Sequence, residues 1–112
     1  MSDRDTLVAK LAPYRETPGI IAALLISRDG FVVAADAEPD FNQNAVAAQV
    51  GGVIDIGTRL AAELRQPTAN YISIEFDDLN VLLAPFDDEL MLALVGKPDT
   101  LSCEYRLKTT GA

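Results

Sequence analysis

The sequence has 112 residues, a length typical of one domain, and 49% of them are apolar. The formal net charge is −8, with acidic side chains spread along the chain. Phosphates would repel such a surface, so nucleic acids and anionic membranes are excluded as favoured partners, and a basic protein surface is favoured. We interpret residues 1–112 as a single domain, with its core at about 5–97 and a short tail at 98–112.

The first third of the chain predicts a helix followed by a buried strand. Apolar residues share one face of a helix over residues 6–12, and Asp5 can cap its start. Pro13 and Pro18 bracket its expected end. Residues 20–26 are continuously apolar, which is typical of a central strand covered on both faces. This run is far shorter than the roughly 20 residues that cross a bilayer, so we expect no membrane insertion.

The segment Arg28-Asp29-Gly30 separates two apolar runs and predicts a tight hairpin. An Asp-Gly pair favours a type I′ turn, which needs positive φ at both central residues. The second strand should then cover residues 31–35.

The longest predicted element is a helix over residues 42–66. Asn42 or Asp40 can cap its start, and Pro67 should stop it. Residues 71–77 then alternate between polar and apolar side chains, so the third strand should have one wet and one dry face. Residues 81–84 and 90–95 predict a fourth and a fifth strand in a meander. The tail from Pro98 suggests a short closing helix, which gives the order α-β-β-α-β-β-β-(α).

The long helix carries two apolar faces. We assign one stripe to packing against the sheet: Val46, Val50, Val53, Gly57, Leu60, Ala61 and Leu64. Between residues 45 and 54 the only polar residue is Gln49, so a second face of small residues remains: Ala45, Ala48, Gly51 and Gly52. Consecutive glycines cost a helix about 1 kcal/mol each relative to alanine, so a closely packed neighbour should offset them. We hypothesise a homodimer through this face.

Two alternatives to the dimer stay open: the small residues let the helix approach its own sheet, or the first helix covers them. The polar residues near these surfaces also have two possible interpretations. Asp55 and Arg59 on the helix, and Ser73 and Glu75 on the wet face of the third strand, are candidates for partner contact or for solvated charge.

Groups that carry catalysis are scarce in this sequence. There is no histidine, and the lone Cys103 can build neither a zinc site nor an internal disulfide, so we interpret it as a packing residue. No glycine pattern matches a phosphate-binding loop, and the acidic turns lack calcium-loop spacing. We expect no catalytic residue, cofactor or metal. The single cysteine and a polar start without a signal-peptide core predict a cytoplasmic protein.

The chain resembles the Roadblock/dynein-light-chain domain family, which includes MglB-type bacterial regulators. The resemblance covers residues 5–97, and its sharpest element is the pair of strands joined at Arg28-Asp29-Gly30. The matching residues run from Pro18-Gly19-Ile20 through Ile26-Ser27 to Val33-Ala34, followed by an Ala-rich helix and by alternating strands that end in Leu-Ala-Leu-Val.

The resemblance implies an α/β (α+β) fold of profilin-like type: a five-stranded antiparallel meander sheet with the long helix on one face. It also implies a homodimer in which the long helices pack together and the third strands pair, so that Tyr71, Ser73 and Glu75 lie at the interface. Family members bind Ras-like small GTPases and have no active site of their own. The short C-terminal region departs from the family pattern.

Three hypotheses for the function follow. The first is a non-catalytic homodimeric scaffold or regulator that binds a Ras-like small GTPase and modulates its GTP hydrolysis. The second is a small-molecule-sensing or signalling adaptor domain without a GTPase partner, although the tightly alternating aliphatic core argues against a ligand cavity. The third, ranked last, is an enzyme that uses Cys103 or an acidic pair.

Overall fold

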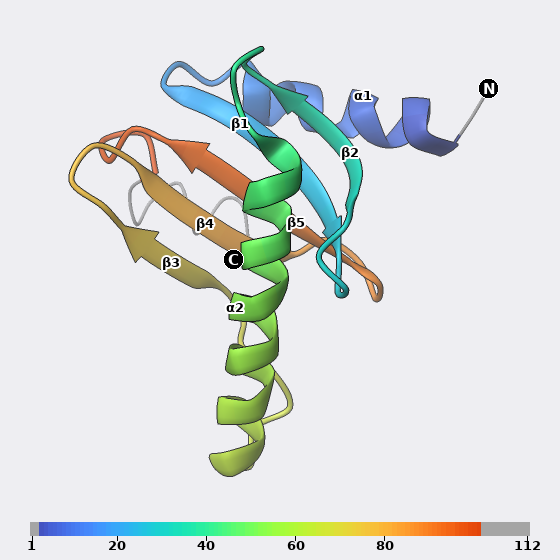
Figure 1. The fold of residues 1–112 in the computed structure, drawn as a ribbon, viewed down its shortest axis with the longest axis vertical. Helices are drawn as coiled ribbons and strands as arrows, with labels where there is room; N and C mark the ends of the chain where they lie inside the picture. The colour runs from blue at the N-terminus through green and yellow to red at the C-terminus, as the bar shows by residue number, and fades with distance from the viewer. Residues whose placement is uncertain (1–2, 102–112) are drawn as a thin grey trace.

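The computed structural model describes residues 3–101. It contains two helices and five strands in the predicted order (Figure 1). Their bounds are α1 Asp3–Arg15, β1 Ile20–Ser27, β2 Val32–Ala37, α2 Gln43–Glu63, β3 Ile72–Glu75, β4 Asn80–Pro85 and β5 Leu90–Gly96. The predicted closing helix and Cys103 lie outside the described residues.

The five strands form one antiparallel sheet in the order β2-β1-β5-β4-β3. β1 pairs with both β2 and β5, which confirms the central strand expected from its continuous apolar run. β3, β4 and β5 form the meander, and β2 and β3 are the two edges. The fold class is therefore the predicted mixed α/β one.

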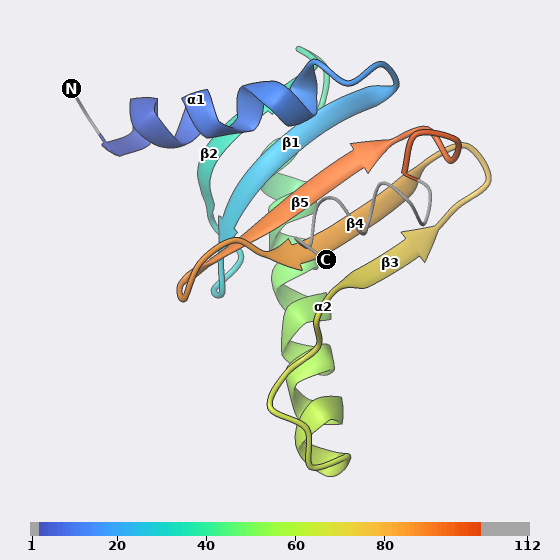
Figure 2. The same ribbon diagram turned by 180° about the vertical axis from the view of Figure 1, so that it is seen from behind.

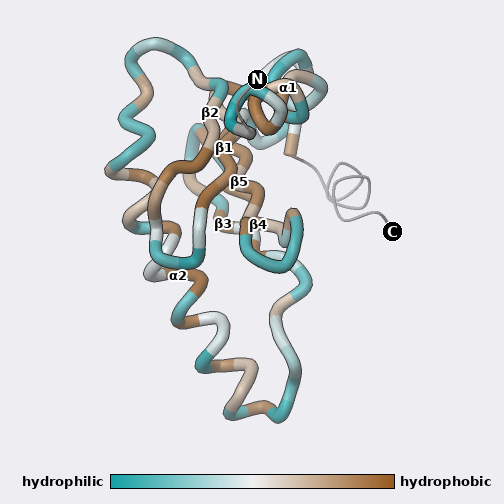
Figure 3. Tube along the Cα trace, turned by 90° about the vertical axis from the view of Figure 1, so that its right-hand side faces the viewer, coloured by the Kyte–Doolittle hydropathy of each residue, from teal (hydrophilic) through white to brown (hydrophobic). Residues whose placement is uncertain are grey.

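Each face of the sheet carries one helix. α1 lies across β1 and β2 on one face, and α2 lies on the opposite face (Figures 1 and 2). Strand alternation divides the core accordingly: Leu25, Leu82 and Leu94 belong to the core cluster on the α1 face of the sheet, whereas Leu83 and Ala93 belong to the cluster on the α2 face. Figure 3 shows the apolar segments gathered along the strands and polar residues at the turns.

α1 begins earlier than the sequence predicts. It also ends later, because Pro13 does not stop it. The proline lies inside the last turn, where it removes a single backbone hydrogen bond near the end of the helix. Leu11 is fully buried in the core, and Arg15 donates from Nη1 to the Ile20 carbonyl at 2.9 Å. Arg15 also pairs with Asp36 at 3.5 Å. These contacts hold the last turn against β1 and β2.

The hairpin between β1 and β2 is not the predicted type I′ turn. Within it only Gly30 has positive φ, at 89°, so Asp29 does not adopt the required left-handed conformation. Gly30 N–H donates to the Ser27 carbonyl, and Ser27 N–H donates to the Phe31 carbonyl, both at 2.9 Å. This pattern is that of a three-residue loop with glycine at its left-handed position. β2 starts one residue later than predicted and runs on to Ala37.

α2 starts where the sequence predicts. The Asn42 side chain accepts a hydrogen bond from Ala45 N–H at 3.3 Å and caps the helix. The last helical residue is Glu63, three residues before the predicted end, and Arg65 follows with a φ of 57°. Pro67 therefore lies in the loop rather than at the helix end.

The sheet-facing side of α2 differs from the predicted stripe. Ala47, Gly51 and Ile54 are buried, although none of them belonged to the predicted stripe. Leu60 and Leu64 did belong to it, yet their exposed fractions are 57% and 62%. The physical reason is that the C-terminal half of α2 extends beyond the sheet, past β3, where no strand lies beneath it (Figures 1 and 2).

Candidate interaction surfaces

Gly51 does not belong to a free second face of α2, which corrects the sequence prediction. A Cβ atom placed on Gly51 would lie 2.8 Å from the Cα of Gly30 and 3.1 Å from its nitrogen. Glycine at both positions therefore lets α2 and the β1–β2 hairpin approach closely. The alternative reading, close packing within the chain, holds for Gly51.

The other small residues of the predicted face do point outward. Ala45, Ala48 and Gly52 are exposed, and a Cβ atom on Gly52 would meet nothing within 4 Å. Asp55 and Arg59 lie along the same side and form an exposed ion pair at 3.2 Å. The N-terminal half of α2 thus offers a smooth outer surface of small side chains.

The C-terminal half of α2 exposes large apolar side chains. Ile56 is 67% exposed, and Leu60 and Leu64 are exposed to a similar extent. An open apolar groove runs between this half of the helix and the loop to β3, with Val53, Ala61 and Ile72 along its walls. Sequence reasoning missed this surface because it assigned the leucines to the sheet.

β3 is an edge of the sheet, as the resemblance implies. Its inner side pairs with β4 from Ile72 to Glu75, and no strand of residues 3–101 lies along its outer side. Ser73 is half-buried, whereas Glu75 and the preceding Tyr71 are exposed. Phe76, predicted on the dry face, falls just beyond the strand end and is exposed.

A hollow of about 710 Å³ opens beside α2, on the same face of the sheet. Its apolar walls come from Phe41 and Val46 near the start of α2, and from Val81 and Val95 on the sheet. Phe76, the acidic residues Glu75, Asp77 and Asp78, and Leu79 complete the lining at the β3–β4 turn. The hollow is therefore apolar inside and acidic along one rim.

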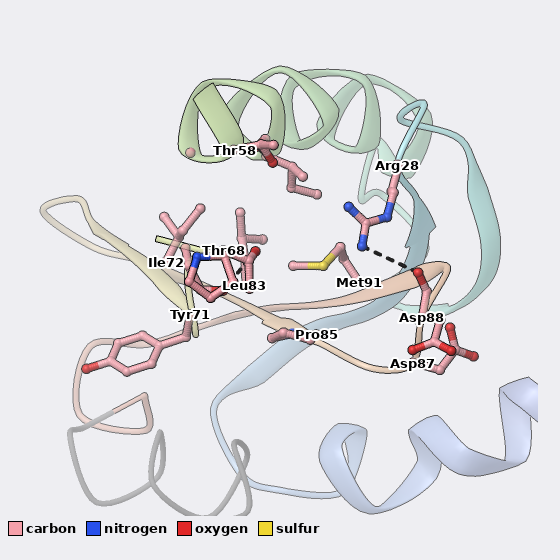
Figure 4. Close-up of a pocket in the computed structure, with 14 residues that line it drawn as sticks. Arg28, Thr58, Thr68, Tyr71, Ile72, Leu83, Pro85, Asp87, Asp88 and Met91 are labelled. Carbon is pink, nitrogen blue, oxygen red and sulfur yellow. Dashed lines mark hydrogen bonds between the residues drawn. The ribbon is translucent and has the colours of Figure 1, made fainter. Parts of the chain in front are cut away.

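A second cavity, of about 390 Å³, lies between α2 and the sheet on the side of the two hairpin turns (Figure 4). Leu83, Met91 and Ile72 lie between the helix and the strands, and Arg28 points from the β1–β2 turn toward Asp88 at one end of the cavity. The tightly alternating aliphatic pattern does not predict this cavity, which opens at the side of the core. The cause is the mismatch between helix and sheet, because α2 rises away from the strands toward its C-terminal end.

Among residues 3–101, no group of three or more His, Cys, Asp or Glu side chains is arranged to hold a metal ion. Neither α1 nor α2 has the length and hydropathy of a membrane-spanning helix.

A five-stranded antiparallel sheet between two helices, with a long apolar helix left partly uncovered, defines an α/β domain of the roadblock type. The chain belongs to the Roadblock/LC7 domain family, whose model matches residues 8–96. This family is generally regulatory and non-enzymatic. A comparison with curated protein sequences returned no match.

Solved structures with the same fold include three of MglB. One is described as MglB with a tetrameric arrangement, with a TM-score of 0.84 at 19% identity over 99% of this chain and 83% of that one. The gliding protein MglB of Thermus thermophilus has a TM-score of 0.82 at 20% identity, covering 99% and 84%. Myxococcus xanthus MglB has a TM-score of 0.84 at 11% identity, covering 98% and 85%.

Proposed function

We propose that this chain is a non-catalytic homodimeric regulator that binds a Ras-like small GTPase in the cytoplasm. The observation that carries the proposal is the exposed apolar side of α2, which continues past the sheet edge as Ile56, Leu60 and Leu64. Contiguous exposed apolar surface of this kind marks a protein contact site. Membership of a regulatory domain family supports the same conclusion.

The first contact of the proposed dimer is between the β3 strands of the two copies. Antiparallel pairing of two β3 strands across a two-fold axis joins the two sheets and satisfies the backbone groups of both edges. The pairing also sets the helix positions. α2 crosses β3 at the strand's N-terminal end, where a Cβ atom on Gly57 would lie 3.2 Å from Cδ1 of Ile72. The acid-rimmed hollow lies at the C-terminal end, beside Glu75 and Phe76.

Antiparallel pairing brings the N-terminal end of one β3 beside the C-terminal end of the other. The protruding half of each α2 then lies over the hollow of the second copy. Leu60 and Leu64 enter the apolar part of the hollow, against Val81 and Val95. The outer faces of the two helices meet along Ala45, Ala48 and Gly52, whose small side chains allow a close approach.

Charge supports this arrangement. Arg59 and Arg65 are the basic residues along the protruding half of α2 and its end, and both are exposed. Glu75, Asp77 and Asp78 rim the hollow that receives this helix end. Opposite charges therefore meet around the apolar contact, which fixes the register of the two copies.

GTPase binding rests on the family. Roadblock domains resemble one another in binding Ras-like small GTPases, and the acidic surface of this chain favours a partner with a basic face.

The test is calorimetry of the full chain with each Ras-like small GTPase of the source cell, loaded with GDP or a non-hydrolysable GTP analogue. We expect saturable binding of at least one GTPase, with two copies of this chain in the complex. The rate of GTP hydrolysis in the same mixture then distinguishes a scaffold from an activator. Absence of binding to every GTPase in both nucleotide states would contradict the GTPase part of the proposal and leave the dimer to be tested by itself.

A further inference from the structure

We propose that the cavity between α2 and the two hairpin turns binds a small molecule that carries one carboxylate on an apolar body. This inference goes beyond GTPase regulation and does not depend on it. The cavity volume of about 390 Å³ lies within the range of small-molecule sites, roughly 300–1,000 Å³. Such sites are mostly apolar, with a few polar groups that fix the orientation of the ligand.

The walls of the cavity supply the apolar part. Ile54 comes from α2, Ile72 from β3, Leu83 from β4 and Met91 from β5. In Figure 4 the side chains of Ile72, Leu83 and Met91 lie between the helix and the sheet, facing the space above the strands. A hydrocarbon chain or an aromatic ring would leave water for this surface, which favours binding.

Arg28 supplies the cation. Its guanidinium group donates from Nη2 to the Asp88 carbonyl at 3.4 Å, across the two hairpin turns (Figure 4). It has no ion pair with any residue between 3 and 101. A guanidinium has five N–H donors in a planar fork that matches a carboxylate. Most of these donors remain available at the cavity.

The hairpin places the backbone of Arg28 at one end of the cavity. Gly30 packs against α2 at Gly51, and the Ser27 hydroxyl accepts a hydrogen bond from Phe31 N–H at 3.2 Å. The turn is thus fixed both to the helix and within itself. A turn whose backbone is already ordered costs less conformational entropy when the ligand binds.

The neighbouring carboxylates select for a single negative charge. Asp87 and Asp88 line the same end of the cavity. Asp87 accepts hydrogen bonds from the backbone N–H groups of Glu89 and Leu90, both at 2.8 Å, which hold its carboxylate at the turn and leave its negative charge in place. Both carboxylates therefore repel a phosphate dianion more strongly than a singly charged carboxylate. The site therefore fits a monocarboxylate better than a phosphate ester.

Thr58 adds an acceptor at the helix wall. Its hydroxyl donates to the Ile54 carbonyl at 2.9 Å, which leaves the oxygen lone pairs for a ligand donor. A hydroxyl or amide N–H partway along the ligand body would meet this acceptor.

The first experiment uses 3-phenylpropionate as the probe, with its uncharged amide and phenyl phosphate as comparisons. Amide shifts of the ¹⁵N-labelled full chain are followed by NMR. We expect saturable shifts with 3-phenylpropionate in roughly the millimolar range, centred on residues 28, 54–58 and 83–91. The amide and the phosphate should bind at least about tenfold more weakly, since each lacks the matched single charge.

The second experiment compares Arg28→Gln with Arg4→Gln, a matched change of an exposed arginine on α1. Arg28→Gln should weaken 3-phenylpropionate binding by about tenfold or more, and Arg4→Gln should leave it unchanged. Equal binding by acid and amide, equal binding by both variants, shifts centred elsewhere, or no saturable binding would each overturn the proposal. The comparison of probes on the unmodified chain decides the matter even if Arg28→Gln fails to fold. No GTPase is present, so failure here leaves the proposed function intact.

Discussion

The two halves of α2 are both rich in apolar residues, but they have opposite surroundings. In the N-terminal half, Ala47, Gly51 and Ile54 are buried against the sheet and the β1–β2 hairpin. In the C-terminal half, Leu60 and Leu64 have no strand beneath them and are exposed. One helix therefore combines a segment that stabilises the fold with a segment that is available to another protein.

Apolar residues on a helix can stabilise either the fold of the chain or its association with another protein, and their spacing in the sequence does not distinguish these two roles. Burial of an aliphatic side chain stabilises the chain only where its own sheet covers it, and burial of a fully exposed leucine is worth about 1.5–3 kcal/mol. In the C-terminal half that free energy becomes available on association. The following experiments change one half at a time.

The largest effect is expected from Leu60→Glu in the exposed half. Each dimer contains two copies of the change, and each places a charge in the apolar hollow, so the dissociation constant of the dimer should rise by about 100-fold or more. Sedimentation equilibrium measures this shift, and circular dichroism should report an unchanged fold.

Ala9→Glu is the control for Leu60→Glu. Ala9 is exposed on α1, on the face of the sheet opposite α2 and its proposed dimer contact. This control should self-associate like the unmodified chain. A Leu60→Glu variant that dimerises as tightly as the control would argue against the proposed interface.

A smaller effect is expected from Gly51→Ala in the packed half. The new Cβ atom would lie 2.8 Å from the Gly30 Cα, so the hairpin or the helix must shift. Such overpacking typically costs about 1–3 kcal/mol, which exceeds the roughly 1 kcal/mol that alanine gains over glycine in a helix. The free energy of unfolding in urea should therefore fall.

Gly52→Ala is the control for Gly51→Ala. Its Cβ atom would meet nothing within 4 Å in the same chain, so the helix should gain up to about 1 kcal/mol. Self-association is measured in the same samples, so that a change at the dimer contact is separated from a change in the fold. If Gly51→Ala and Gly52→Ala have the same free energy of unfolding, the close contact of α2 with the hairpin does not limit which side chain is tolerated at residue 51.

The smallest effect is expected from the charged rim. Asp77→Lys and Arg65→Glu should each weaken the dimer by about two- to fivefold, because exposed ion pairs contribute roughly 0.2–1 kcal/mol. The double variant should regain most of the lost affinity, and the effect should shrink at high salt. Glu16→Lys, which changes the net charge equally but lies beyond α1, is the control. A double variant as weak as the sum of the single ones would argue against this pairing.

Much of the secondary structure was predictable because its signals are local. The continuous apolar run of β1, the alternation around β3 and the cap at Asn42 each act within a few residues. Pro13 misled the prediction for α1, since core contacts of Leu11 and Arg15 outweigh one lost hydrogen bond near a helix end. The hairpin was located correctly, but its turn type depends on the φ of Asp29, which the Asp-Gly pair does not fix.

The interaction surfaces were predicted only in part. Ala45, Ala48 and Gly52 point outward as expected, but Gly51 packs within the chain. The cavity under Arg28 had no sequence signal at all, because its lining comes from separate segments between residues 28 and 91. Neither its residues nor its shape follows from any local pattern.

By itself, the sequence determined the element order, the central position of β1 and the presence of more apolar surface on α2 than one sheet can cover. Only the tertiary structure decided which side of α2 faces inward and how far the helix runs past β3. The physical reason is that a helix apolar nearly all round has no preferred orientation of its own. Its rotation is set by the closest approach available, which is that of Gly51 to Gly30.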